Sequence, residues 1–475
     1  MKRQLLFILV ALVPMLASAY DALIDGIYYN LNDGTKTAEV TNRTGDERAR
    51  SYSGFVSIPF NISYDGVTYS VTSIGKSAFS NCDYLTEVSI PGSVKSIGED
   101  AFLFCNKLTS QFIPSSVTTI GEAAFFGCSG LTKLTIQSKV TSIGEAAFSC
   151  CSALTSITVK KDNRYYEDMG CNAIIEKSTN KLIAGCNNTI IPSSVTSIGA
   201  GAFQNCTGLT SVTLPQSLTS IGESAFGGCT GLKSVEIPKS VTTIGAYAFH
   251  DCTGITYIEI PNNVTRIEDG TFKGCTNLIW AYYYYVKSIG DDAFSGCQRL
   301  SFTEIYKTVT SIGKRAFSGC KNIYALIIPY SVITIGEEAF RGCTKLTEVT
   351  IGESVKSIGR YAFNECLAIK KVVCNVKVPP TVDGFGTFDN ENVSDITLYV
   401  PLTCKEDYKR WGDINPNNII EMGTEGKTEL ELLRATVDEL WDRYRAVRDG
   451  DINEDGKVNV EDVTKVVKNA LKRRY

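Results

Sequence analysis

The sequence predicts a solenoid of the α/β class, in which one short structural unit is stacked on itself about 12 to 13 times. An Ile-Gly step, replaced by Ile-Glu at Ile267, marks each unit from Ile74 to Ile358, and most successive steps are 23 residues apart. The exceptions are a gap of 55 residues between Ile143 and Ile198 and one of 22 residues after Ile267. A fixed period of this length indicates a repeat architecture, because a single unit cannot bury its own apolar face.

The unit itself predicts two extended segments and one turn of helix. Its pattern, L-T-x-V-x-I-P-x-S-V-T-x-I-G-x-x-A-F-x-x-C, fits residues 209–229 closely. L-x-x-V-x-I alternates like a strand with one buried face, and Pro ends that strand because Pro has no N–H for a sheet. S-V-T-x-I predicts a second, shorter extended segment, and Gly allows a tight corner. A-F-x-x-C fits one helical turn with Phe and Cys on the inward side.

The repeats resemble the BspA-like leucine-rich repeats of bacterial surface and secreted proteins over about residues 70–375. The combination of Ile-Gly-x-x-Ala-Phe-x-x-Cys with Ile-Pro carries this resemblance. It implies a right-handed solenoid with a parallel sheet on one face. It also implies a role in attachment, since some members of the family bind host matrix proteins or other cells.

The segments outside the repeats predict an export signal, two caps and a small C-terminal module. Lys2 and Arg3 precede an apolar run and Ala17-Ser18-Ala19, a pattern typical of a signal peptide cleaved after Ala19. No later apolar run approaches the roughly 20 residues of a membrane span, so a secreted or cell-surface protein is expected. The predicted segments are the signal peptide at 1–19, a β-rich N-terminal cap at 20–72, the repeats at 73–390 with a hairpin insertion at about 165–190, a C-terminal cap at 391–423, and a linker helix with a helical EF-hand or dockerin-like tail at 424–475.

The insertion and the C-terminal cap have readable patterns. Residues 173–176 and 181–184 predict a hairpin turned at residues 178–180, in place of the helical turn of one copy. Alternating apolar residues at 396–400 predict a strand, and a helix is expected to pass through residues 408–411.

Seventeen cysteines in an exported chain would ordinarily indicate a disulfide scaffold. Twelve of them, from Cys82 to Cys366, lie three residues after a repeat Phe and so occupy one structural position. We interpret them as a buried ladder of small apolar side chains. Disulfides between neighbouring copies are the alternative, although side chains that point the same way suit a disulfide badly.

Composition argues against several chemistries. The net charge of −4 and the pI near 5.5 give no support for nucleic-acid binding. The single histidine, His250, lies at a variable position of the repeat. Ser-His-Asp catalysis, Cys-His catalysis and His-rich zinc sites are therefore not expected.

The tail contains a twelve-residue loop at 451–462 with the ligand spacing of an EF-hand calcium site. Gly456 allows the sharp turn at the sixth position, and Asp stands at the twelfth position where Glu is usual. A structural Ca²⁺ is therefore expected. Its predicted ligands are Asp451, Asn453, Asp455, the backbone carbonyl of Lys457, and Asp462.

This tail also resembles a dockerin repeat, the calcium module that binds cohesin domains. The sequence has one such loop where dockerins usually carry two, and Val460 and Glu461 stand where many dockerins place the hydroxyl residues that meet cohesin. The resemblance implies cohesin as a partner. A local calcium clip that folds the tail is the alternative.

The outward face of the L-x-x-V-x-I strands is the expected binding surface. The residues on either side of V point away from the core, and they change from small or polar in early copies to aromatic in later ones. Since parallel strands lie roughly 4.8 Å apart, these side chains should form one contiguous patch, edged by glutamates that include Glu236. The alternative is that aromatic residues merely suit strands. The predicted patch is Tyr257, Glu259, Trp280, Tyr282, Phe302, Glu304 and Ile327.

Three functions are compatible with these patterns. The favoured one is a non-enzymatic binding protein that recognises proteins or glycans on host or neighbouring cells. The second is an accessory protein recruited through the dockerin-like tail to a cohesin-containing, polysaccharide-degrading assembly at the cell surface. The third is a glycosidase with paired carboxylates such as Glu236 and Glu259, which a flat open sheet without a water-excluding cleft argues against.

Overall fold

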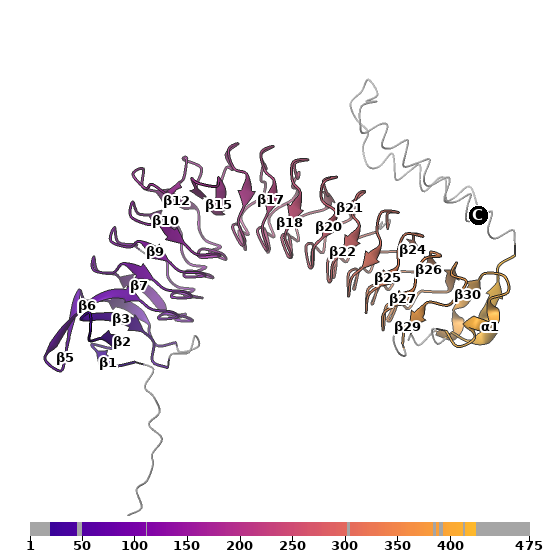
Figure 1. Ribbon diagram of the computed structural model, residues 1–475, viewed down its shortest axis with the longest axis horizontal. Coiled ribbons are helices and arrows are strands. Elements are labelled where there is room, and N and C mark those ends of the chain that lie inside the picture. The colour runs from indigo at the N-terminus through magenta and orange to yellow at the C-terminus, as the bar shows by residue number, and fades with distance from the viewer. Residues whose placement is uncertain are drawn as a thin grey trace, which may run out of the picture.

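The structure is a computed structural model that describes residues 20–44, 50–110, 112–301, 305–382, 386–388, 393–411 and 414–423. These residues form one elongated solenoid that curves into an arch between its N-terminal and C-terminal ends (Figure 1). The signal peptide expected at residues 1–19 and the tail expected at residues 424–475 lie outside the described residues.

The turns of the solenoid, here called coils, stack through two sets of parallel strands, and the longer strands form only in some coils. The resemblance implied a parallel sheet on one face, whereas L-x-x-V-x-I and the Ser/Thr-Ile step each form a ladder of their own. The long strands are β7 (Leu85–Ser89), β10 (Lys133–Ile136), β12 (Ser156–Val159), β19 (Tyr257–Glu259), β21 (Trp280–Tyr282), β24 (Ala325–Ile328), β26 (Glu348–Ile351) and β28 (Lys371–Cys374). The short strands are β8 (Ser96–Ile97), β9 (Thr119–Ile120), β11 (Ser142–Ile143), β16 (Ser197–Ile198), β17 (Ser220–Ile221), β18 (Thr243–Ile244), β20 (Arg266–Ile267), β22 (Ser288–Ile289), β23 (Ser311–Ile312), β25 (Thr334–Ile335), β27 (Ser357–Ile358) and β29 (Thr381–Val382).

The helical turn predicted for A-F-x-x-C is wrong, and with it the α/β class. Two residues of each coil have a left-handed backbone, as Ser77 (φ 53°) and Asn81 (φ 56°) do, and a right-handed helix cannot pass through them. Alternate N–H groups therefore bond to the next coil: the N–H of Phe79 donates to the carbonyl of Ala101 at 2.7 Å. The chain is a parallel β-solenoid with almost no helix in its described part.

The repeat phenylalanines form a continuous stack inside the solenoid. Neighbouring rings lie 4.8 to 5.8 Å apart between centroids, with interplanar angles of 3° to 14°. The stack is broken once among the described residues, between Phe148 and Phe203. Gly185 lies there, and a Cβ on Gly185 would come within 2.1 Å of the Phe203 ring. The core is accordingly divided into two clusters at this insertion.

The cysteines form a second inward ladder, as predicted. All seventeen are buried, and none forms a disulfide. Ten of the twelve repeat thiols donate to a carbonyl of a preceding coil: Cys105 Sγ donates to the carbonyl of Phe79 at 3.1 Å, and Cys128 Sγ to that of Phe102 at 3.1 Å. Burial raises the pKa of these thiols well above the ordinary value, which keeps them protonated and suited to packing.

The strands expected near the N-terminus are present and extend both ladders beyond the first repeat. Residues 20–74 contain β1 (Ala22–Ile24), β2 (Ile27–Asn32), β3 (Thr37–Thr41), β4 (Gly54–Ser57), β5 (Asn61–Tyr64) and β6 (Val67–Ile74). β1, β2 and β3 are antiparallel, β3 then pairs in parallel with β6, and β6 with the short strand β8. β4 pairs in parallel with the long strand β7.

The hairpin expected in the insertion is present at the predicted residues. β14 (Ile174–Glu176) is antiparallel to β15 (Lys181–Ala184), and β13 (Tyr166–Glu167) pairs with β14. β15 then pairs in parallel with β16. The hairpin therefore supplies a short strand of the coil. The A-F-x-x-C turns on either side of it bond directly to each other, since the N–H of Cys150 donates to the carbonyl of Gln204 at 3.0 Å, which agrees with the prediction that the hairpin takes the place of one such turn.

The C-terminal end closes the stack of rings. This end contains, in chain order, the 3-10 turn η1 (Val393–Asp395), β30 (Thr397–Val400), α1 (Lys405–Tyr408), the 3-10 turn η2 (Pro416–Asn418) and β31 (Ile419–Glu421). Trp411 packs against Phe388, the last ring of the stack, at 5.8 Å. Its Nε1–H donates to the carbonyl of Pro380 at 2.9 Å, and the Tyr408 hydroxyl donates to the carbonyl of Val376 at 2.6 Å.

Candidate binding surface

The long strands present two columns of side chains outward, on either side of the buried V position. On β19, Tyr257 and Glu259 are exposed while Ile258 between them is buried. The same alternation holds on β24, where Ala325 and Ile327 are exposed. These two strands thus expose both columns as the repeat pattern predicted, whereas the second outward position is buried at Thr350 on β26 and Val373 on β28. We call this surface the sheet face.

The structure brings four residues of the predicted patch together. β19 and β21 are neighbours in parallel register, with Tyr257 beside Trp280 and Glu259 beside Tyr282. Tyr257 is 48% exposed, but Trp280 and Tyr282 are half-buried. Ile327, 43% exposed, lies two coils further along the sheet face. Phe302 and Glu304, which would lie between them, fall outside the described residues.

A buried cluster of tyrosines below this patch was missed by the sequence reading. Tyr283, Tyr284 and Tyr306 are buried. The rings of Tyr284 and Tyr306 are 4.9 Å apart, and Tyr284 stacks on Tyr282 at 6.1 Å. Tyr284 and Tyr306 stand where other copies have Pro, so the signal was present in the sequence as two successive copies without Ile-Pro. This cluster explains why Tyr282 is held partly inside the surface.

Further exposed apolar residues lie beside the predicted patch and were also missed. Tyr285, Tyr324, Tyr330 and Ile333 are each exposed by 41% to 51%. They occupy positions outside the two columns, so a reading restricted to those columns could not find them. The sheet face also carries Phe55 and Phe112 near the N-terminal end, exposed by 60% and 69%. Large exposed apolar residues are therefore as numerous between Phe55 and Phe112 as in the coils from Tyr257 to Ile333.

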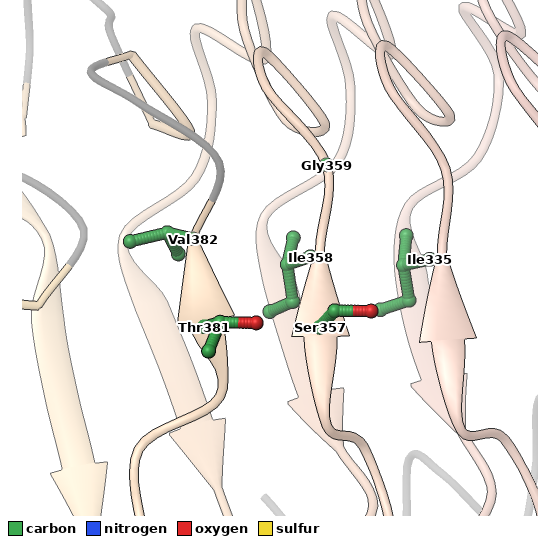
Figure 2. Close-up of a pocket in the computed structure, with 6 residues that line it drawn as sticks. All are labelled: Ile335, Ser357, Ile358, Gly359, Thr381 and Val382. Carbon is green, nitrogen blue, oxygen red and sulfur yellow. The ribbon is translucent and has the colours of Figure 1, made fainter.

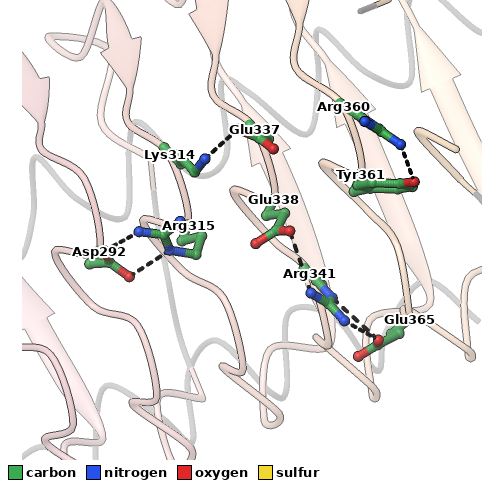
Figure 3. Close-up of polar contacts among 9 residues, drawn as sticks. All are labelled: Asp292, Lys314, Arg315, Glu337, Glu338, Arg341, Arg360, Tyr361 and Glu365. Carbon is green, nitrogen blue, oxygen red and sulfur yellow. Dashed lines mark hydrogen bonds and ion pairs between the residues drawn. The ribbon is translucent and has the colours of Figure 1, made fainter. Parts of the chain in front are cut away.

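Ion pairs join neighbouring coils at the corner that follows the repeat glycine (Figure 3). Arg315 donates to both carboxylate oxygens of Asp292, from Nε at 3.0 Å and from Nη2 at 2.7 Å. Arg341 donates to a single carboxylate oxygen of Glu365 in the next coil, from Nε at 3.2 Å and from Nη2 at 2.6 Å. Arg315 and, more weakly, Lys273 hold the pKa of the Asp292 carboxyl below its ordinary value. These charges are satisfied within the chain, which favours a role in holding coils in register.

Replacing Asp292 by Asn is expected to lower the free energy of unfolding by about 1–2 kcal/mol at pH 7, since the partner Arg315 is partly solvated. Because the folded pKa of Asp292 is depressed, its contribution is present above the ordinary carboxyl pKa and is lost as the pH falls through the folded pKa. Urea unfolding at several pH values should show the wild-type advantage shrinking below about pH 4. A difference that stays constant down to pH 2 would contradict this assignment, and Glu365→Gln, in an exposed pair, serves as the weaker control.

A shallow depression of about 350 Å³ lies on the short-strand ladder (Figure 2). It spans β25, β27 and β29 and is lined by Ile335, Ser357, Ile358, Gly359, Thr381 and Val382. This lining offers aliphatic groups and two hydroxyls, and it contains no carboxylate, imidazole or amine to act as an acid, base or nucleophile. The described residues include no group of three or more His, Cys, Asp or Glu side chains that could hold a metal ion.

The calcium loop falls outside the described residues, so its expected ligands Asp451, Asn453, Asp455, Lys457 and Asp462 have no described geometry. The dockerin-like resemblance lies on the same segment and stays a prediction from the sequence. Within the described chain, no helix has both the length and the apolar character needed to cross a membrane.

Two parallel ladders, an inward stack of Phe and Cys, and a coil of 23 residues define a leucine-rich repeat solenoid. A model described as "BspA type Leucine rich repeat region (6 copies)" matches residues 60–171, 173–285 and 281–391. The chain belongs to the BspA-type leucine-rich repeat family, and the description of that family model names no catalytic activity. No curated protein matches the chain.

The chain is similar to solved structures of several bacterial proteins. A leucine-rich repeat protein from Bacteroides ovatus is 27% identical, with a TM-score of 0.43, covering 74% of this chain and 94% of its own. A leucine rich cell surface protein from Faecalibacterium prausnitzii is 28% identical, with a TM-score of 0.44 and the same coverage of 74% and 94%. The pneumococcal vaccine antigen PcpA is 17% identical, with a TM-score of 0.35, covering 85% of this chain and 98% of its own.

Proposed function

We propose that this protein is an exported, non-enzymatic binding protein that attaches to proteins or glycans on host or neighbouring cells through the sheet face of its solenoid. One observation carries the proposal: Tyr257 and Trp280 lie side by side on a rigid parallel ladder, with further exposed apolar residues in the coils that follow. Large aromatic residues gathered on one face are typical of a protein-binding or ligand-binding surface.

The buried tyrosines next to the patch support the same function. Buried Tyr284 stacks on Tyr282 of the patch and packs against buried Tyr306, so the Tyr282 ring is held in place before a partner arrives. A pre-organised surface loses little conformational entropy on binding. Family membership supports attachment in general, and the cell-surface description of the Faecalibacterium relative supports a location outside the cell.

The proposal can be tested with an array of extracellular-matrix proteins and glycans probed with residues 20–475. The variant Tyr257→Ala with Ile327→Ala is expected to bind at least about tenfold more weakly, because both side chains lie in the exposed patch. Tyr165→Ala is the matched control, since Tyr165 is 49% exposed but lies in the insertion. Melting temperatures of all three proteins should agree closely, because the altered side chains are exposed.

Equal binding by wild type and the patch variant, equal losses for the patch and control variants, or no binding to any array member would each contradict the proposal. Trp280 and Tyr282 are less suitable for this test. Both are half-buried, and Tyr282 stacks on Tyr284, so their removal would mix binding with stability.

We further propose that the tail binds one Ca²⁺ through Asp451, Asn453, Asp455, the carbonyl of Lys457, and Asp462. The support is the donor set itself, which is all oxygen and carries three carboxylates at EF-hand spacing. Isothermal titration should show one site in the full chain and its loss in Asp451→Ala with Asp455→Ala. Asp462→Glu should tighten binding, because Glu at the twelfth position reaches the ion with both oxygens. An unchanged titration in the double variant would contradict the site.

A further inference from the structure

We propose that the partner of the sheet face presents cationic side chains, Arg or Lys, which dock over Tyr257 and against the carboxylates of Glu236 and Glu259. This inference rests on the proposed function and names the chemistry of the partner at the N-terminal edge of the patch. A protein segment with exposed Arg or Lys residues would supply these groups.

Two carboxylates stand in one outward column at this edge. Glu236 and Glu259 follow the buried residues Val235 and Ile258 in successive coils, and both are exposed. The two residues are 23 positions apart, so they hold equivalent places in successive coils, and we expect their carboxylates to lie near each other. A cation bound between two nearby carboxylates is attracted by both.

Elsewhere the chain pairs charges of opposite sign across the same step between coils. Lys76 pairs with Glu99 at 2.6 Å, Arg341 with Glu365 at 2.6 Å, and Lys371 with Glu348 at 2.7 Å. Among the described residues, Glu236 forms no such ion pair with a Lys or Arg. The chain therefore leaves a carboxylate on the sheet face that a partner can neutralise.

Tyr257 also differs from comparable residues of the chain, because it has no cation over its ring among the described residues. Four other exposed or half-exposed tyrosines hold a cation of this chain over the ring, at distances between 4.4 and 5.7 Å: Tyr84 with Lys107, Tyr324 with Lys345, Tyr361 with Arg360, and Tyr399 with Lys371. In the part of the chain that the structure describes, Tyr257 has no Lys or Arg over its ring. Its neighbours across the coils are Ser234, from the repeat spacing, and Trp280.

A guanidinium or ammonium group could contact both the aromatic rings and the carboxylates of this site. The faces of Tyr257 and Trp280 attract a cation through the ring quadrupole, most strongly for Trp. The carboxylate of Glu259 follows two residues after Tyr257 on the same face, Glu236 holds the equivalent place in the preceding coil, and both can accept its N–H groups. A guanidinium can stack and donate at once, because its planar fork offers five N–H donors.

The test uses a fluorescent decapeptide of alternating Arg and Ala, and fluorescence anisotropy with the full chain at low and physiological salt. Glu236→Gln with Glu259→Gln should bind about tenfold more weakly, and Tyr257→Ala about threefold. Glu122→Gln with Glu145→Gln is the control. These residues also form an exposed pair 23 residues apart and remove the same charge, but lie at the corner without an aromatic neighbour. The control should stay within about twofold of wild type.

A peptide with citrulline in place of Arg should not bind. Equal binding of the citrulline peptide, or an equal loss in the Glu122 and Glu145 control, would overturn the inference and indicate diffuse charge attraction. If the Arg peptide fails to bind while the Tyr257 and Ile327 variant still loses binding on the array, the cationic partner is wrong and the proposed function stands. If array binding is also unaffected, both fail.

Discussion

Replacing Phe317 by Ala is expected to lower the free energy of unfolding by about 3–5 kcal/mol. The Phe317 ring is fully buried and lies between Phe294, at 5.2 Å and 9°, and Phe340, at 5.3 Å and 3°. Its removal leaves a cavity with a ring on each side. The backbone cannot collapse into that cavity, because the N–H of Phe317 bonds to the carbonyl of Ala339 at 2.7 Å and fixes the spacing of the coils.

Urea unfolding followed by circular dichroism measures this loss. Phe55→Ala is the control, since Phe55 is 60% exposed on the sheet face, and its cost should stay below about 0.5 kcal/mol. Phe317→Leu should fall between the two variants because it keeps much of the buried volume. Similar costs for Phe317→Ala and Phe55→Ala would show that the stack of rings does not hold the coils together.

The repeat period predicted the features that depend on alternation and burial. The coil length, the long strands and the inward positions of Phe and Cys all follow from residues that recur every 23 positions. Such features are predictable because apolar side chains must face a common core in every copy. The hairpin at β14 and β15 was predictable for a similar reason, since two apolar runs flank a polar turn.

The features that failed depend on backbone conformation. A-F-x-x-C has helical spacing, but residues such as Asp292 and Arg315 adopt left-handed φ values of 54° and 51°. The residue type does not predict this conformation, because charged, aromatic and small residues as well as Gly occupy the left-handed positions. The hydrogen bonds made to the next coil compensate for the strain, and they exist only when coils are stacked.

The sheet-face patch was predicted in position but not in depth. Alternation placed Tyr257 and Trp280 in one outward column, and the register confirms that they are neighbours. It did not predict that Trp280 and Tyr282 are half-buried, because their burial depends on Tyr284 and Tyr306 filling the position that Pro occupies in other copies. The departures from the repeat therefore shape both the patch and the core below it.

Replacing Gly121 by Ala is expected to lower the free energy of unfolding by about 3 kcal/mol. A Cβ on Gly121 would lie 2.5 Å from the backbone N of Glu99 and 2.5 Å from the carbonyl carbon of Gly98. Both atoms belong to the backbone of the preceding coil, so no side-chain rotation can relieve the clash. The glycine of the Ile-Gly step thus permits close stacking of coils, whereas the sequence had suggested a tight corner.

Gly92→Ala provides the matched control for this last prediction. A Cβ on Gly92 would have no atom within 4 Å, and its φ is not in the left-handed region, so the change should cost less than about 0.5 kcal/mol. The two variants differ only in what the new methyl group meets. Separation of the coils at Gly121 would also weaken the bond from its N–H to the carbonyl of Ile97, now 2.8 Å, and hydrogen exchange at that amide should accelerate. Equal stability of the two variants would mean that neighbouring coils can move apart at little cost, and that the glycine column does not set their spacing.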